Sequence, residues 1–212
     1  MSATSTRKLP IVVLISGSGS NLQAIIDAVQ AGLPAEIRAV ISNKAAAYGL
    51  ERARLAGIPT HVLNHKDYAD RESYDAALAQ VIDDSKAELV VLAGFMRILS
   101  AGFVRRYEGR MLNIHPSLLP RHRGLDTHAR ALAAGDEEHG ATVHFVSPEL
   151  DAGPIILQAR VPVETDDSPE SLAARVLREE HRIYPQAIRW FAEGRLRLEH
   201  GRALLDQQPI TP

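Results

Sequence analysis

The stretch Ile11-Val-Val-Leu-Ile-Ser-Gly-Ser-Gly-Ser-Asn-Leu-Gln23 decides the fold of this chain. Its first five residues are all apolar, as in a strand buried on both faces, and a turn of glycine and serine leads from them into a helix-period segment at 21–31. Amide groups at a helix N-terminus favour an anion, so this turn predicts a phosphate site. A plain strand-to-helix turn capped by Asn21 is the alternative interpretation.

The turn does not match the common nucleotide motifs. Leu22 stands where a dinucleotide fingerprint has its third glycine, and Ser42-Asn43-Lys44 stands where that fingerprint has a ribose-binding acid. The Gly-Lys-Ser/Thr ending of a P-loop is also missing. The turn therefore predicts a phosphate site that is neither a dinucleotide fingerprint nor a P-loop.

Outward from this stretch, short apolar runs alternate with helical patterns. Together they predict an α/β fold: an open, mostly parallel twisted sheet with helices on both faces. Two later runs, joined through a turn-rich segment at 147–154, predict an antiparallel addition. Residues 1–8 are predicted to be a disordered tail and 9–212 a single domain. The further predicted strands are 37–41, 60–63, 89–92, 111–114, 141–146 and 155–163, and the further helices are 48–56, 71–85 and 100–107.

A long helix is marked by Ser168 as N-cap and Pro169 in its first turn. Glu180 falls on its apolar stripe, where a hydrophobic residue is expected. A structural partner and a ligand contact are equally good explanations of this carboxylate. The stripe consists of Leu172, Val176, Ile183, Ala187 and Phe191.

Composition narrows the function classes. With 45% hydrophobic and 24% charged residues the chain can bury a core. It has no cysteine, which excludes disulfides, a thiolate zinc site and a cysteine nucleophile. The N-terminus has no export signal, no apolar run approaches the ~20 residues of a membrane span, and a net charge of -2 gives no case for nucleic acid. We expect a cytoplasmic protein with small-molecule substrates, either a monomer or a homodimer.

The second candidate site lies at the end of a predicted strand. Asn113 and His115 are two positions apart, so their side chains point the same way at the sheet edge where α/β folds bind ligands. An asparagine amide can donate to a developing oxyanion, and an imidazolium can donate a second hydrogen bond or a proton. Asp151, in the turn-rich segment, would favour and orient a protonated His115, or it is only a turn residue. The spacing of His115, His122 and His128 matches no usual zinc pattern.

Seven motifs follow one another in this chain, at residues 16–23, 41–44, 93–99, 113–120, 135–140, 150–154 and 180–185. Together and in this order they closely resemble the phosphoribosylglycinamide formyltransferase family. The resemblance extends from Ile11 to about Leu198 and implies an α/β fold with an amino-terminal nucleotide half. It also implies 10-formyltetrahydrofolate as co-substrate, no metal, and formyl transfer to the primary amine of 5'-phosphoribosylglycinamide in purine biosynthesis.

The resemblance also implies roles for individual residues. Asn113, His115 and Asp151 form the catalytic group. Gly19, Ser20 and Asn21 hold the phosphate of the amine substrate, and Glu180 lies near its glycinamide end. The folate site is lined by Arg71, Met96, Arg97, Ile98, Leu99, Asn113, Ser147, Pro148, Glu149, Leu150 and Asp151.

The loop at 121–128 departs from the family, because Arg123 replaces a frequent proline and Asp126 a histidine found in several members. Two related enzymes share the catalytic pattern. A formyltetrahydrofolate hydrolase normally has a preceding regulatory domain, whereas the first strand here starts at Ile11. A methionyl-tRNA formyltransferase needs a further carboxyl-terminal domain and a basic face. A non-catalytic nucleotide-binding module explains the glycine turn but not the second site. We therefore expect a member of the phosphoribosylglycinamide formyltransferase family.

Overall fold

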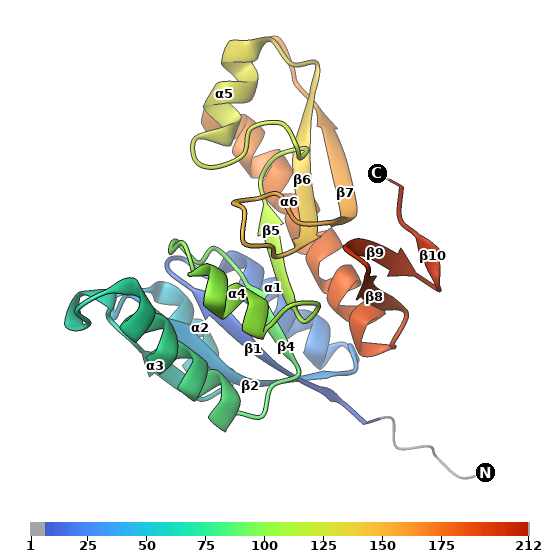
Figure 1. Ribbon diagram of the computed structural model, residues 1–212. Helices are drawn as coiled ribbons and strands as arrows, with labels where there is room; N and C mark the ends of the chain where they lie inside the picture. Colours follow the sequence, from blue (N-terminus) through green and yellow to red (C-terminus); the bar gives the residue numbers. More distant parts are fainter. Residues whose placement is uncertain (1–6, 212) are drawn as a thin grey trace.

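The computed structural model describes residues 7–211 and contains a seven-stranded sheet with helices on both sides (Figure 1). The strand order is β3-β2-β1-β4-β5-β6-β7. The strands are β1 (Leu9–Ile15), β2 (Ala35–Ser42), β3 (Thr60–Val62), β4 (Leu89–Leu92), β5 (Met111–His115), β6 (Glu138–Phe145) and β7 (Ile155–Pro162). Residues 1–6 of the predicted disordered tail lie outside the described part of the chain, whereas Arg7 forms an ion pair with Glu88.

Strand β5 is the point at which the sheet changes direction. It runs parallel to β4 and antiparallel to β6, and β6 and β7 form an antiparallel pair. The strands from β3 to β5 are all parallel. The predicted parallel α/β sheet with a late antiparallel addition is therefore confirmed.

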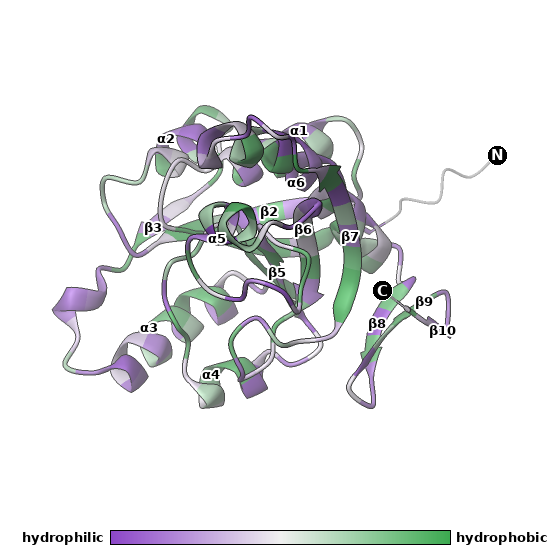
Figure 2. Cartoon of the chain, turned by 90° about the horizontal axis from the view of Figure 1, so that it is seen from above, coloured by the Kyte–Doolittle hydropathy of each residue, from purple (hydrophilic) through white to green (hydrophobic). Residues whose placement is uncertain are grey.

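Helices cover the sheet in two layers, which Figure 2 shows from above with α1, α2 and α6 on one side and α3 and α4 on the other. Alternate residues of β1 face the two layers: Ile11 and Val13 belong to the core under α1 and α6, and Val12 and Leu14 to the core under α3 and α4. This double burial explains the unbroken apolar run. The helices are α1 (Ser20–Gln30), α2 (Tyr48–Leu55), α3 (Arg71–Asp84), α4 (Ala101–Arg106), α5 (Thr127–Ala134), α6 (Pro169–Ala192) and the 3-10 turn η1 (His65–Asp67).

Helix α6 begins as predicted. The Ser168 hydroxyl accepts a hydrogen bond from the Ser171 amide at 3.2 Å, and Pro169 occupies the first turn. Its buried stripe fixes the helix against α1, β6 and β7. Tyr184, fully buried, places its hydroxyl 2.8 Å from the Leu92 carbonyl and 3.0 Å from the Leu112 carbonyl, so it ties α6 to the last residue of β4 and the second residue of β5.

After α6 the chain forms a small antiparallel sheet that the sequence did not predict. It has the order β10-β9-β8 and lies beside the main sheet (Figure 1). Its strands are β8 (Leu196–Glu199), β9 (Arg202–Leu205) and β10 (Gln208–Pro209). Among residues 7–211, no helix is both long enough and apolar enough to cross a membrane.

Candidate active site

Four polar side chains meet where β5 ends. His115, only 5% exposed, has Nδ1 3.4 Å from Asp151 Oδ2. Asn113 Nδ2 lies 3.2 Å from His144 Nε2, and the same nitrogen of His144 is 4.0 Å from Asp151 Oδ1. The structure thus brings the three predicted catalytic residues into one cluster and adds His144 to it.

His144 fixes the orientation of the Asn113 amide. Its Nδ1 is 2.9 Å from the Phe145 carbonyl, which can only accept, so Nδ1 carries the hydrogen and Nε2 is left to accept from Asn113. Burial lowers the pKa of His144 and keeps the ring neutral, which this arrangement requires. His144 sits directly opposite Asn113 in the β5–β6 register. Sequence reasoning missed it because the run 141–146 is otherwise mostly apolar.

The predicted loop at 121–128 is a loop only as far as Asp126, the N-cap of α5, and it contacts this cluster. The Gly124 amide donates to Asp151 Oδ2 at 2.9 Å, and His115 Nε2 donates to the His122 carbonyl at 2.9 Å. Arg123, the departure from the family, forms an ion pair with Glu149 at 2.7 Å. The residues after Arg121 therefore hold both Asp151 and His115 in place.

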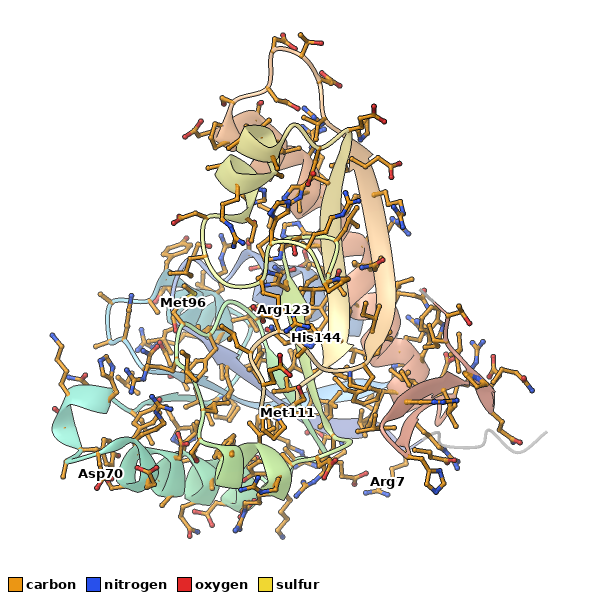
Figure 3. The ribbon with its side chains drawn as sticks, turned by 45° about the horizontal axis from the view of Figure 1, so that its top comes forward. Arg7, Asp70, Met96, Met111, Arg123 and His144 are labelled. Atoms are coloured by element: carbon orange, nitrogen blue, oxygen red, sulfur yellow. The ribbon has the colours of Figure 1, made fainter. Side chains whose placement is uncertain are left out.

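A cleft opens beside the cluster and is lined by most residues predicted to bind folate. Arg97, Ile98, Leu99, Asn113 and residues 147–151 all line it, together with Leu92, Phe95, Val104, His144 and Val146. Two predicted residues do not: Arg71 is exposed at the start of α3, and the Met96 side chain is 58% exposed. Figure 3 shows Met96, Arg123 and His144 reaching this end of the sheet from three separate segments.

The glycine turn brings together the residues predicted to bind the amine substrate. Helix α1 begins at Ser20 with Gly19 as N-cap, so Asn21 lies inside the helix, and the alternative in which Asn21 caps it is wrong. Instead, Asn21 Nδ2 donates to Glu180 Oε2 at 2.6 Å, and both residues are buried. Burial raises the pKa of the Glu180 carboxyl, and the bond from Asn21 opposes this rise.

Gly19 is required by the packing of the turn itself. Its φ is 70°, and a Cβ there would lie 2.5 Å from the Cα of Gly49 at the start of α2. A side chain is therefore excluded by both conformation and space.

Three other histidines lie side by side, with the ring of His139 5.2 Å from that of His128 and 6.1 Å from that of His122. His122 pairs with Asp136 at 2.6 Å, and His139 Nε2 lies 3.2 Å from His128 Nδ1. Burial and the neighbouring His128 and His122 lower the pKa of His139 to about 4. Within residues 7–211, no three His, Cys, Asp or Glu side chains are arranged to hold a metal ion.

Residues 9–188 match the family described as "Formyl transferase", and the chain belongs to this family. Similar relatives are the phosphoribosylglycinamide formyltransferases of Escherichia coli strain K12 and Haemophilus influenzae. The first is 59% identical over 95% of this chain and 96% of its own, the second 52% over 94% and 95%. The solved structure of the Coxiella burnetii phosphoribosylglycinamide formyltransferase, in complex with CHES, is 55% identical. It superposes with a TM-score of 0.94 over 96% of both chains.

Proposed function

We propose that this protein transfers the formyl group of 10-formyltetrahydrofolate to the primary amine of 5'-phosphoribosylglycinamide. The products are formylglycinamide ribonucleotide and tetrahydrofolate, in de novo purine biosynthesis. One observation carries the proposal: Asn113, His115 and Asp151 meet beside a cleft at the end of β5 in a chain that matches phosphoribosylglycinamide formyltransferases over nearly its whole length.

The chemistry requires stabilisation of a tetrahedral oxyanion, because a formamide is a poor electrophile. An asparagine amide has two hydrogens. One hydrogen of Asn113 is used by His144, and the other is free to bind the oxyanion. Protonated His115 is the second donor, and Asp151 faces its Nδ1.

The proton balance assigns the remaining steps. The substrate amine attacks the formyl carbon, the bond from that carbon to N10 of the folate breaks, and one proton moves from the amine nitrogen to N10. In one route a water held by Asp151 takes the proton from the amine and passes it to N10. In the other, Asp151 takes that proton, His115 gives its own proton to N10, and Asp151 then returns a proton to His115 Nδ1, 3.4 Å away. Because the amine is the nucleophile, no covalent enzyme intermediate forms. His115 Nε2 is bound to the His122 carbonyl here, so a donor role for this nitrogen requires the loop to move.

The proposal also assigns the two substrate sites, as the resemblance implies. Gly19, Ser20 and Asn21 hold the phosphate at the N-terminus of α1, and Glu180 contacts the glycinamide end. The folate occupies the cleft lined by residues 97–99 and 147–151. Arg71 and Met96 contact it from outside that lining. The enzyme acts in the cytoplasm on small molecules, as a monomer or a homodimer, without a metal or a nucleic acid.

Donor turnover tests the proposal. The purified protein is incubated with 10-formyltetrahydrofolate, with and without 5'-phosphoribosylglycinamide, and deformylated folate is measured. Release only when the amine is present supports the transferase. Release without the amine indicates a hydrolase, and no release in either case indicates a binding protein, so either outcome contradicts the proposal.

A further inference from the structure

The segment that follows β4 is an extended piece of chain outside any sheet. From Phe95 to Leu99 its side chains alternate, and the outward ones, Met96 and Ile98, are 58% and 59% exposed. Within residues 7–211, the main-chain N–H and C=O groups of residues 97–99 make no hydrogen bond. These groups are therefore free to bind a ligand in the adjoining cleft, provided that the segment keeps its shape.

The first end of this segment is held by Ser16. Its hydroxyl accepts a hydrogen bond from the Met96 amide at 2.8 Å and donates one to Asn43 Oδ1 at 2.5 Å. Ser16 and Asn43 are 3% and 2% exposed, so neither group exchanges this bond for water. Ser16 also directly precedes the glycine turn, which makes it a link between the two substrate sites.

The second end is held by Asp75, a residue of α3 that is 4% exposed. Asp75 Oδ2 accepts a hydrogen bond from the Ser100 amide at 2.7 Å. Its other oxygen, Oδ1, has no partner among the described residues. Burying a carboxylate is costly, and helix α3 does not need one at this position. The bond to Ser100 therefore indicates that Asp75 serves to hold the chain at Ser100 rather than to stabilise α3.

We propose that Ser16 and Asp75 are positioning residues that clamp the donor-binding segment 96–99 from its two ends. The inference rests on the proposed function in that the donor is taken to be the formylated folate. Neither residue lines the cleft. Both act through the main chain, by keeping the free groups of residues 97–99 at a fixed distance from Asn113 across the cleft.

Substitutions at the two ends provide the first test. Asp75→Ala removes the acceptor, Asp75→Asn retains an amide oxygen in its place, and Asp84→Ala is the control in the last turn of the same helix. We expect the KM for 10-formyltetrahydrofolate to rise about tenfold in Asp75→Ala and Ser16→Ala, while the KM for the amine changes much less. Asp75→Asn should stay within about threefold of the wild type. A lower kcat with both KM values unchanged would mean only a loss of folded enzyme and would overturn the proposal.

The double variant tests whether the two residues act on one segment. If one substitution already lets segment 96–99 move, the second substitution adds little further movement. We therefore expect the donor KM of Ser16→Ala/Asp75→Ala to rise by clearly less than the product of the two single effects. A full product would show two independent effects and no common clamp.

Hydrogen exchange of the ligand-free protein separates this proposal from the proposed function. The Met96 amide should exchange faster in Ser16→Ala, and the Ser100 amide faster in Asp75→Ala, than in the wild type, with the core strands unchanged. Unchanged exchange in folded variants overturns the clamp. If the wild type shows no formyl transfer, the proposed function fails, and the exchange rates still decide whether the clamp exists.

Discussion

At the residue scale, Asp151 is the side chain whose substitution tests the mechanism most directly. Asp151→Asn keeps an oxygen that can accept the Gly124 amide, so the loop stays anchored, but it removes the negative charge facing His115. We expect the single-turnover rate near pH 7 to fall by about a hundredfold or more, with much smaller changes in substrate binding.

Rapid-quench measurement at saturating substrates gives this rate, and equilibrium titration gives the two affinities. A near-normal rate would make Asp151 a turn residue. The mechanism would then rest on Asn113 and His115.

Glu180 allows a prediction about pH. Because burial raises its pKa in the folded protein, the folded state binds more protons than the unfolded state between the two pKa values. The free energy of unfolding therefore falls as the pH rises through this window and stays lower above it. Glu180→Gln removes this loss, so the variant should gain stability relative to the wild type at pH 7–8 and gain nothing below the ordinary glutamate pKa of 4.5.

Urea unfolding across this pH range measures the effect, and Glu179→Gln is the matched control because Glu179 is paired with Arg182 at the surface of the same helix. If Glu180 contacts the substrate, turnover of Glu180→Gln should also fall by about tenfold or more. Parallel pH profiles for Glu180→Gln and the wild type would contradict the burial argument, and full activity would return Glu180 to a structural role.

At the scale of elements, the junction between the glycine turn and α2 depends on two glycines. Gly19→Ala would put a Cβ 2.5 Å from the Gly49 Cα at a φ of 70°. We expect a loss of stability of about 1–3 kcal/mol. Gly17→Ala, in the same turn with nothing within 4 Å of its Cβ, should change the stability by less than about 0.5 kcal/mol.

Thermal unfolding of the two variants decides this prediction. Equal melting temperatures would show that α2 yields to the added methyl group. The result also matters for binding experiments, because a branched residue at Gly19 disturbs the fold as well as the predicted phosphate site.

The elements themselves were largely predictable from the sequence. Buried parallel strands are continuous apolar runs, and Ser168-Pro169 marks the start of α6. Both kinds of element can therefore be recognised from a few neighbouring residues of the sequence. Strand β6 begins at Glu138, earlier than predicted, because the polar residues Glu138 and His139 gain their strand character only by pairing with β7. The small sheet β8–β10 is built from short strands that include charged residues and turn at Gly201, with a φ of 74°, and such segments show no periodicity.

The site was predictable only in part, because contacts between distant segments leave no local signal in the sequence. Asn113 and His115 share a strand end, which is a local signal, but their neighbours come from other segments. His144, Ser16 and Asp75 become recognisable only when the strand register and the packing of α3 are known. The roles of the predicted catalytic and binding residues remain predictions for the experiments above.

At the scale of the whole molecule, Tyr184 connects the last long helix to the middle of the sheet. Tyr184→Phe removes a buried hydroxyl that the Leu92 and Leu112 carbonyls share. We expect the free energy of unfolding to fall by about 1–2 kcal/mol and the melting temperature by several degrees. Tyr48→Phe, at a site 57% exposed, is the matched control and should behave like the wild type. Equal stability of Tyr184→Phe and the wild type would show that the hydroxyl adds nothing to the packing of α6.

The hydrogen bonds that hold segment 96–99 and the bond between Asn21 and Glu180 span very different lengths of chain, so they form at different times during synthesis. Ser16 and Met96 are 80 positions apart, and Asp75 and Ser100 are 25 apart, so both ends of segment 96–99 have their partners once the first half of the chain has left the ribosome. Asn21 must wait for Glu180, 159 positions later. Because domains fold progressively as they emerge, segment 96–99 can be anchored well before Asn21 meets Glu180, although the cleft that it lines also needs Asn113, His144 and residues 146–151. We therefore expect activity only after α6 has emerged.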